Sequence, residues 1–251
     1  MVIEFLGIPG AGKTTLASAV AKELRGRGYS CHLSLSDDPP RRRELRARIL
    51  HVKKVVWALA ADPRLGSCLL AFVLRTRPRS LPRIIRMGSF VRLMDGALRR
   101  SRQGPERYAV LDQGLLQAIW SIVLFGTPPP QGSLRALLRV LHARYPIGAV
   151  VVDVEPGLAW ERLVTRPVAK SRIERAGRGD LMTALNTYAP YFREIAALWP
   201  GPVLTVTPDG RRPLREDVEG IVAFIEKGRG LLEAVESTKP RPPGSTGRRH
   251  A

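Results

Sequence analysis

Residues 7–15 read GIPGAGKTT, and this stretch is the most informative part of the chain for predicting its fold. They fit the pattern G-x-x-x-x-G-K-[ST] in full, between an apolar stretch typical of a strand (2–6) and an Ala/Leu-rich stretch typical of a helix (14–25). The glycines let the backbone curl so that its N–H groups point inward at phosphate oxygens. The helix that opens at Lys13 adds its dipole and its free N–H groups. The stretch therefore predicts a phosphate-binding loop for a nucleoside triphosphate.

The side chains of this loop predict ATP and Mg²⁺ as the cofactors. Lys13 can place a positive charge between the β- and γ-phosphates, and the Thr14 hydroxyl can ligate Mg²⁺. A chance glycine turn is the alternative, and the strand and helix predicted on either side argue against it. The loop residues expected to bind the nucleotide are Gly7, Gly10, Ala11, Gly12, Lys13, Thr14 and Thr15.

Strand-like and helix-like stretches alternate along the rest of the chain, which favours a parallel, doubly wound sheet. Val150, Val151 and Val152 stand together, as in strands that are buried on both faces. We predict an α/β P-loop NTPase three-layer fold with a parallel sheet of about five strands, a helical insert and an arginine lid. The strands are expected at 2–6, 29–35, 108–111, 148–154 and 203–206, and the helices at 14–25, 41–102 in about three pieces, 115–124, 134–144, 158–165, 181–199 and 214–227.

Composition removes several classes of protein. The 251 residues carry a formal net charge of +19 and contain only two cysteines, which excludes a disulfide framework and a cysteine-based zinc site. The N-terminus lacks the pattern of a signal peptide. The longest uncharged apolar stretch, 65–74, is shorter than the roughly 20 residues of a bilayer-spanning helix. We therefore expect a cytoplasmic protein.

The positive charge is concentrated in two segments. Residues 41–107 hold 18 Lys/Arg and 4 Asp/Glu, a local net charge of +14, and residues 237–251 hold four basic residues and no acid. We expect one kinase-sized domain over 1–236 that contains the basic helical insert 41–107 on its acceptor side. The Pro/Gly/Arg-rich tail 237–251 is expected to be disordered.

Asp112 is the candidate second carboxylate of the site. It follows the predicted strand 108–111, and the carboxyl ends of parallel strands face the phosphate site. There it could organise Mg²⁺ or accept a proton from an acceptor hydroxyl; capping the next helix is the alternative. Gln113 follows it, where motor-type ATPases often carry a second acid. This favours a transferase.

Three arginines lie where a lid over the phosphates is expected. Arg162 and Arg166 are four residues apart and could share a helix face, and Arg172 follows them. Arginines bind the equatorial oxygens of a transferring phosphoryl group bidentately. A solvated basic surface is the alternative for each of them.

Taken together, these segments resemble the thymidylate kinase-like branch of the P-loop nucleotide kinases. The resemblance covers 1–35 and 108–227, through the loop and the segments VLDQG (110–114) followed by Gln117, VDVEP (152–156) followed by Glu161, Arg162 and Arg166, SRIE (171–174) and TPDG (207–210). It implies catalytic roles for Lys13, Asp112 and Arg172, and a Mg²⁺ site at Thr14 and Asp112. It also implies nucleotide contacts from Arg162, Arg166 and Asp209 and acceptor contacts from Gln113 and Gln117.

The departures from the family pattern fall mainly on the acceptor side. Pro9 stands where the family has an acid that contacts the nucleoside sugar, and Gln113 where it has an arginine that binds the acceptor phosphate. Ser171 replaces the first acid of the lid motif. The ATP side is intact, so the sequence predicts ATP binding and leaves the acceptor open.

The basic insert allows several interpretations. Arg86, with Arg83 and Arg92, could contact a phosphorylated or polyanionic acceptor. The apolar residues within 69–74 could face an anionic membrane surface or belong to the core. Nucleic acid is less favoured because the insert has few aromatic residues, and a solvated helical cap is the alternative to all three.

The sequence as a whole predicts an ATP-dependent phosphotransferase. The expected reaction moves the ATP γ-phosphoryl group to a nucleoside monophosphate or a similar small acceptor. The alternatives are a P-loop kinase of a sugar, lipid-linked or antibiotic hydroxyl, and a regulatory ATPase associated with nucleic acid. A homodimer is left open.

Overall fold

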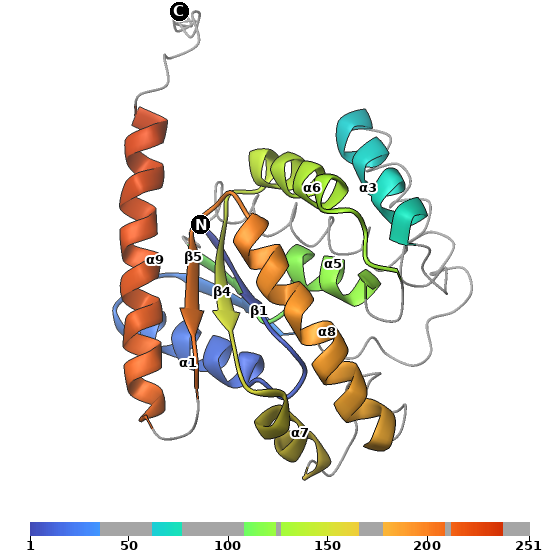
Figure 1. The fold of residues 1–251 in the computed structure, drawn as a ribbon. Helices are drawn as coiled ribbons and strands as arrows, with labels where there is room; N and C mark the ends of the chain where they lie inside the picture. The colour runs from blue at the N-terminus through green and yellow to red at the C-terminus, as the bar shows by residue number, and fades with distance from the viewer. Residues whose placement is uncertain (36–61, 77–107, 124–126, 166–177, 209–211, 238–251) are drawn as a thin grey trace, which may run out of the picture.

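The computed structural model describes residues 1–35, 62–76, 108–123, 127–165, 178–208 and 212–237 (Figure 1). Within these residues the chain forms one parallel sheet with the strand order β2-β3-β1-β4-β5. The first strand therefore lies at the centre, between two strands that come much later in the chain. The strands are β1 (Val2–Leu6), β2 (Cys31–Ser34), β3 (Tyr108–Leu111), β4 (Ile147–Val152) and β5 (Val203–Val206).

Helices cover both faces of the sheet. Helices α1 and α9 pack together on one face, while α5, α6 and α8 lie on the other, with α3 against α6 and α7 against α8 (Figure 1). The three layers and the parallel sheet confirm the predicted α/β P-loop NTPase fold. The helices are α1 (Lys13–Gly26), α3 (Pro63–Thr76), α5 (Leu115–Val123), α6 (Gln131–Arg144), α7 (Pro156–Val164), α8 (Arg178–Leu198) and α9 (Leu214–Ser237).

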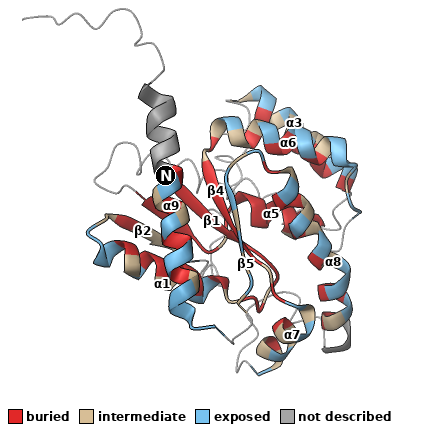
Figure 2. Ribbon diagram, turned by 60° about the vertical axis from the view of Figure 1, so that its left-hand side comes forward, coloured by how far each residue is buried: buried red, intermediate tan, exposed pale blue. Residues whose placement is uncertain are grey.

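Burial follows the position of each strand in the sheet. Every residue of β1, β3 and β4 is buried, because these inner strands have neighbours on both sides and helices on both faces. The edge strand β5 alternates between exposed and half-buried residues (Figure 2). Phe5, Leu6 and Val110, all at 0% exposure, belong to the core between sheet and helices.

Several helix boundaries differ from the sequence prediction. Helices α7 and α8 begin two and three residues before the predicted starts at 158 and 181, and larger or better explained differences occur in α6 and α9. Helix α6 begins at Gln131 and not at 134, because the Pro130 carbonyl already accepts hydrogen bonds from the N–H groups of Ser133 and Leu134. Helix α9 continues to Ser237, ten residues beyond the predicted end at 227. Gly228 does not end it: a Cβ there would lie 2.9 Å from the Met1 side chain, so this glycine allows close packing.

Helix α3 is the described part of the basic insert, and its apolar residues divide into two sets. Leu69, Phe72 and Val73 are buried, whereas Leu70 and Leu74 are 60% and 67% exposed. The run 69–74 is therefore partly core and partly surface. The predictions for 41–61, 77–107 and the tail 238–251 lie outside the described residues. Across the part of the chain that the structure describes, we found no helix long and apolar enough to cross a membrane.

Candidate functional site: the phosphate loop and the strand ends around it

The loop between β1 and α1 curls back on itself at its glycines. Gly10 and Gly12 have φ of +84° and +95°, the left-handed region that L side chains rarely adopt. Gly7 is required for a different reason, since a Cβ there would lie 2.5 Å from the Val152 carbonyl oxygen at the end of β4. A Cβ on Gly10 would lie 2.4 Å from the Ala159 carbonyl oxygen of α7. The glycines thus set both the curvature of the loop and its close packing on β4 and α7.

Lys13 closes the loop. Its ammonium nitrogen donates hydrogen bonds to the carbonyl oxygens of Gly7 (2.7 Å) and Ile8 (2.9 Å), and the residue is only 8% exposed. Its positive charge therefore lies against the loop itself, where phosphate oxygens are expected to bind.

The head of α1 is suited to an anion. Gly12 occupies the N-cap position without a side-chain cap, and the first turn contains no acidic residue. The helix dipole and the N–H groups of the first turn consequently favour a negatively charged ligand at this point.

Thr14 and Asp112 meet beside the loop, as the sequence predicted from two distant segments. The Thr14 hydroxyl donates to Oδ2 of Asp112 over 3.0 Å. Strand β3 is the direct neighbour of β1, with Glu4 paired to Leu111, so Asp112 leaves the sheet at the carboxyl edge where the loop begins. Asp112 is 2% exposed, whereas Thr14 is exposed and accessible to a ligand.

The oxygen atoms of this pair fit the preference of Mg²⁺, a hard cation that takes one or two protein oxygens, water and substrate phosphates. Within the described segments no group of three or more His, Cys, Asp and Glu side chains could hold a metal by itself. An ion held jointly by Thr14, Asp112 and a bound nucleotide agrees with both observations.

A second carboxylate lies behind the loop, fully buried inside β1. Oε1 of Glu4 accepts a hydrogen bond from the Gln117 N–H (2.8 Å) in the first turn of α5, and Oε1 of Gln117 accepts one from the Gly7 N–H (3.1 Å). Burial raises the Glu4 pKa from 4.5 to about 7, against a smaller lowering by the backbone N–H groups of residues 114–117. The sequence analysis did not select Glu4, although a charged residue inside an apolar strand was a visible signal.

Arg162 joins α7 to the segment that follows β5. Its Nη2 donates to the Pro208 carbonyl oxygen over 3.1 Å. This contact places Arg162 beside Pro208, at the start of the segment that follows β5. Helix α7 ends at Val164, so Arg166 lies beyond its end and outside the described residues.

The end of β4 carries an ion pair that the sequence analysis did not foresee. Arg193 of α8 donates to both carboxylate oxygens of Asp153 over 2.9 and 2.8 Å, and this carboxylate raises the arginine's pKa. The pair fixes α8 to the carboxyl edge of the sheet. Asp153 and Arg193 are 40 residues apart, so local patterns gave no sign of it.

Comparisons with known proteins find similarity among solved structures alone. No protein-family model matches the chain, and neither does any curated protein sequence. Among solved structures, a deoxyadenosine kinase from M. mycoides with bound dATP superposes with a TM-score of 0.47 and 16% identity over 90% of this chain and all of the other. An APS kinase from Mycobacterium tuberculosis in complex with AMPPNP and APS has a TM-score of 0.44 and 17% identity, over 90% of this chain and 96% of the other. A shikimate kinase from Bacteroides thetaiotaomicron has a TM-score of 0.45 and 14% identity, over 90% of this chain and 98% of the other.

The predicted site residues fall into two groups. The structure brings together the loop residues, Asp112 and Gln117, while Gln113 lies half-buried directly after Asp112. Ala11 is buried and Thr15 exposed. Oε1 of Gln117 accepts a hydrogen bond from the Gly7 N–H, so this oxygen is bound within the protein and does not face solvent. The remaining predicted residues lie outside the described part of the chain: Arg86, Arg166, Arg172 and Asp209.

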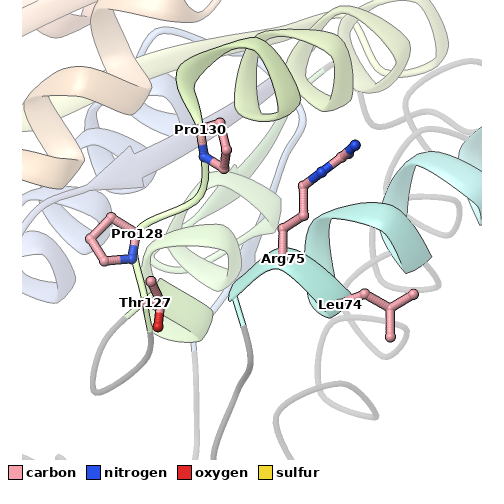
Figure 3. Close-up of a pocket in the computed structure, with 5 residues that line it drawn as sticks. All are labelled: Leu74, Arg75, Thr127, Pro128 and Pro130. Atoms are coloured by element: carbon pink, nitrogen blue, oxygen red, sulfur yellow. The ribbon is translucent and has the colours of Figure 1, made fainter.

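A separate pocket of about 440 Å³ lies between the end of α3 and the segment that enters α6. Figure 3 shows Pro128 and Pro130 on that segment, across from Leu74 and Arg75 of α3; Thr127 completes the lining. None of these residues belongs to the predicted nucleotide site.

Proposed function

We propose that this chain is an ATP-dependent phosphotransferase of the thymidylate kinase-like type. It transfers the γ-phosphoryl group of ATP to a small acceptor, and nucleoside monophosphates are the first class to test. The observation that carries the proposal is the contact between Thr14 and Asp112 beside the Lys13-closed loop. A hydroxyl and a carboxylate next to a phosphate loop are the protein oxygens that a Mg·nucleotide complex requires.

The chemistry follows from the position of each group. An acceptor oxygen attacks the γ-phosphorus, the bond between this phosphorus and the β–γ bridging oxygen breaks, and ADP leaves. Lys13 and the head of α1 stabilise the negative charge of the phosphates, because the ammonium lies against the loop and the first turn of α1 has free N–H groups and no acidic residue. Thr14 and Asp112 hold Mg²⁺, which supplies further charge neutralisation when bound.

The groups on the acceptor side and the lid remain predictions from the sequence. Arg172 is proposed to stabilise the transferring group, and Arg162, Arg166 and Asp209 to contact the nucleotide. The contact of Arg162 with the Pro208 carbonyl supports this role, because Pro208 belongs to the TPDG segment of the resemblance. Arg86, Gln113 and Gln117 are proposed on the acceptor side.

The test is product formation from Mg·ATP with a panel of nucleoside monophosphates, run for the wild type, Lys13→Ala and Lys22→Ala. Lys22 lies exposed on the same helix and serves as the matched control. We expect ADP and a nucleoside diphosphate in equal amounts from the wild type and from Lys22→Ala. The Lys13→Ala variant is expected to lose at least about 100-fold in rate, as expected when a group that stabilises developing charge is removed.

The other outcomes are equally informative. Tight ATP binding without transfer to any monophosphate contradicts the nucleotide-kinase proposal and moves the search to sugar, lipid-linked or antibiotic hydroxyls. ATP hydrolysis without an acceptor, stimulated by DNA or RNA, favours the regulatory ATPase. Failure to bind ATP at all contradicts the proposed function altogether.

A further inference from the structure

We propose that Glu4 is a positioning residue of the nucleotide site: through Gln117 it holds the first N–H of the phosphate loop, and its protonation is coupled to nucleotide binding. The inference rests on the proposed nucleotide binding, and it adds a proton-linked control of that binding.

The connection consists of two hydrogen bonds in series. The Glu4 carboxylate accepts from the Gln117 backbone N–H over 2.8 Å, and the Gln117 side chain accepts from the Gly7 N–H over 3.1 Å. Gln117 is 4% exposed and Glu4 is completely buried, so water does not compete at either bond. Glu4 thus fixes the backbone of Gln117 at the start of α5, and the side chain of Gln117 reaches from there to the Gly7 N–H at the end of β1.

The structure makes room for the carboxylate in particular. A Cβ on Gly114 would lie 2.5 Å from Oε2 of Glu4, so the chain passes the carboxyl group as closely as a glycine permits. Oε2 accepts no hydrogen bond of good geometry, although the N–H groups of residues 114–117 lie close enough to the carboxyl group to lower its pKa. A buried carboxylate oxygen without such a bond is costly, which is what we expect of a group kept for function rather than for stability.

Protonation changes the charge behind the loop but keeps the hydrogen bonds. A carboxylic acid can retain its carbonyl oxygen toward Gln117 and carry the proton on Oε2, so the loop stays anchored in both forms. Only the ionised form places a negative charge behind a loop that must bind a polyanion. Nucleotide binding therefore favours the protonated form and takes up a proton.

In the described part of the chain the charged groups around β1 are few, and Glu4 is the one whose protonation we propose to be coupled to nucleotide binding. Helix α5 contains no charged residue. The elements packed on β1 contribute Asp112 after β3, Asp153 after β4 and Lys13 at the end of the loop. Asp153 is paired with Arg193, and Lys13 with loop carbonyls. With a pKa of about 7, Glu4 changes its charge in the neutral range.

The test measures the dissociation constant of a fluorescent ADP analogue, in excess Mg²⁺, from pH 6 to pH 8.5 for the wild type and Glu4→Gln. The glutamine keeps an oxygen for Gln117 and carries no charge. Because the nucleotide titrates too, the ratio of the two constants is the quantity to follow. We expect the wild type to lose affinity relative to Glu4→Gln as the pH rises through 7, with a limit of about tenfold for each unit by which bound nucleotide raises the Glu4 pKa.

A second pair of variants tests the mechanical link. Gln117→Leu removes the acceptor of the Gly7 N–H and is expected to weaken nucleotide binding about tenfold at every pH. Ser121→Ala is the matched control, since its hydroxyl donates to the Gln117 carbonyl within the same helix and does not touch the loop.

Two results overturn the inference: a constant ratio between wild type and Glu4→Gln across the pH range, or unchanged nucleotide binding by Gln117→Leu. A wild type that does not bind the analogue contradicts the proposed function instead, so the two failures are distinguishable.

Discussion

At the scale of single residues, the site is organised by where side chains are missing as much as by where they are present. Gly7 and Gly10 each leave space that a neighbouring carbonyl oxygen occupies, and Lys13 fills the interior of the turn that they create. The loop is therefore built into the sheet and α7 and does not adopt its form alone.

Gly10→Ala is expected to weaken nucleotide binding by more than about tenfold, because the new Cβ would sit in a strained conformation (φ +84°) and 2.4 Å from the Ala159 carbonyl oxygen. Binding of a fluorescent ATP analogue measures the effect. Gly157→Ala, in α7 where a Cβ meets nothing within 4 Å, is the control and should bind as the wild type does. Equal binding by both variants would contradict the geometry of the loop.

Asp112→Asn is expected to weaken Mg²⁺ binding in the presence of nucleotide, since an amide keeps the shape but not the charge of the Thr14 partner. Titration of ADP binding with and without Mg²⁺ gives the measurement. A loss of about 10- to 100-fold in metal affinity is typical when one such group is changed. An unchanged Mg²⁺ titration would exclude Asp112 from the metal site.

At the scale of elements, Asp62 links helices α3 and α6. It begins α3 by accepting from the Leu65 N–H over 3.1 Å, and it forms an ion pair with Arg144 in the last turn of α6. The N–H of Leu65 lowers the Asp62 pKa first and Arg144 lowers it further. One side chain thus fixes the start of one helix and the end of another.

Asp62→Ala is expected to lower the free energy of unfolding by about 1 kcal/mol at neutral pH. Because the folded pKa lies below the ordinary value of 3.8, this stabilisation is complete above that value and is lost as the pH falls through the folded pKa. Denaturant unfolding of the variant and the wild type should therefore converge in acid. Arg64→Ala, exposed beside it, is the control; a difference that persists in strong acid would contradict the cap.

Much of this element structure could be predicted because each strand is a short apolar run with clear breaks. Strands β1, β3 and β5 have the predicted boundaries to the residue. The end of α9 was wrongly predicted, because Gly228 lies inside the helix and packs against Met1, a contact between segments far apart in the sequence. The Thr14–Asp112 contact could be predicted because the order of the strands places both residues at the same edge of the sheet. The Arg193–Asp153 pair could not be predicted because it depends on how α8 packs on the sheet.

At the scale of the whole molecule, burying Glu4 has a cost that the entire fold must offset. The pKa of about 7 lies above the ordinary 4.5, so the folded chain holds this proton more tightly than the unfolded chain. The contribution of Glu4 to the free energy of unfolding is complete below pH 4.5 and is lost as the pH rises through 7. The total loss is on the order of 3 kcal/mol.

Equilibrium unfolding of the wild type and Glu4→Gln at pH 5 and pH 8 tests this. We expect the free energy of unfolding of the wild type to fall, relative to the variant, between the two pH values. Other groups titrate over this range in both proteins and cancel in the difference. A difference that is the same at both pH values would show that the carboxyl group titrates normally.

The strand order has a consequence in time. β1 is synthesised before the strands it pairs with, β3 and β4, and its last partner, Val151, emerges some 145 residues after Leu6. At about 5–20 residues per second, translation takes on the order of ten seconds to cover that distance. Until β3 emerges, the strand that leads into the loop has neither of its sheet neighbours. The nascent chain is therefore expected to expose this strand early, and to complete its nucleotide site only after β4 has been synthesised.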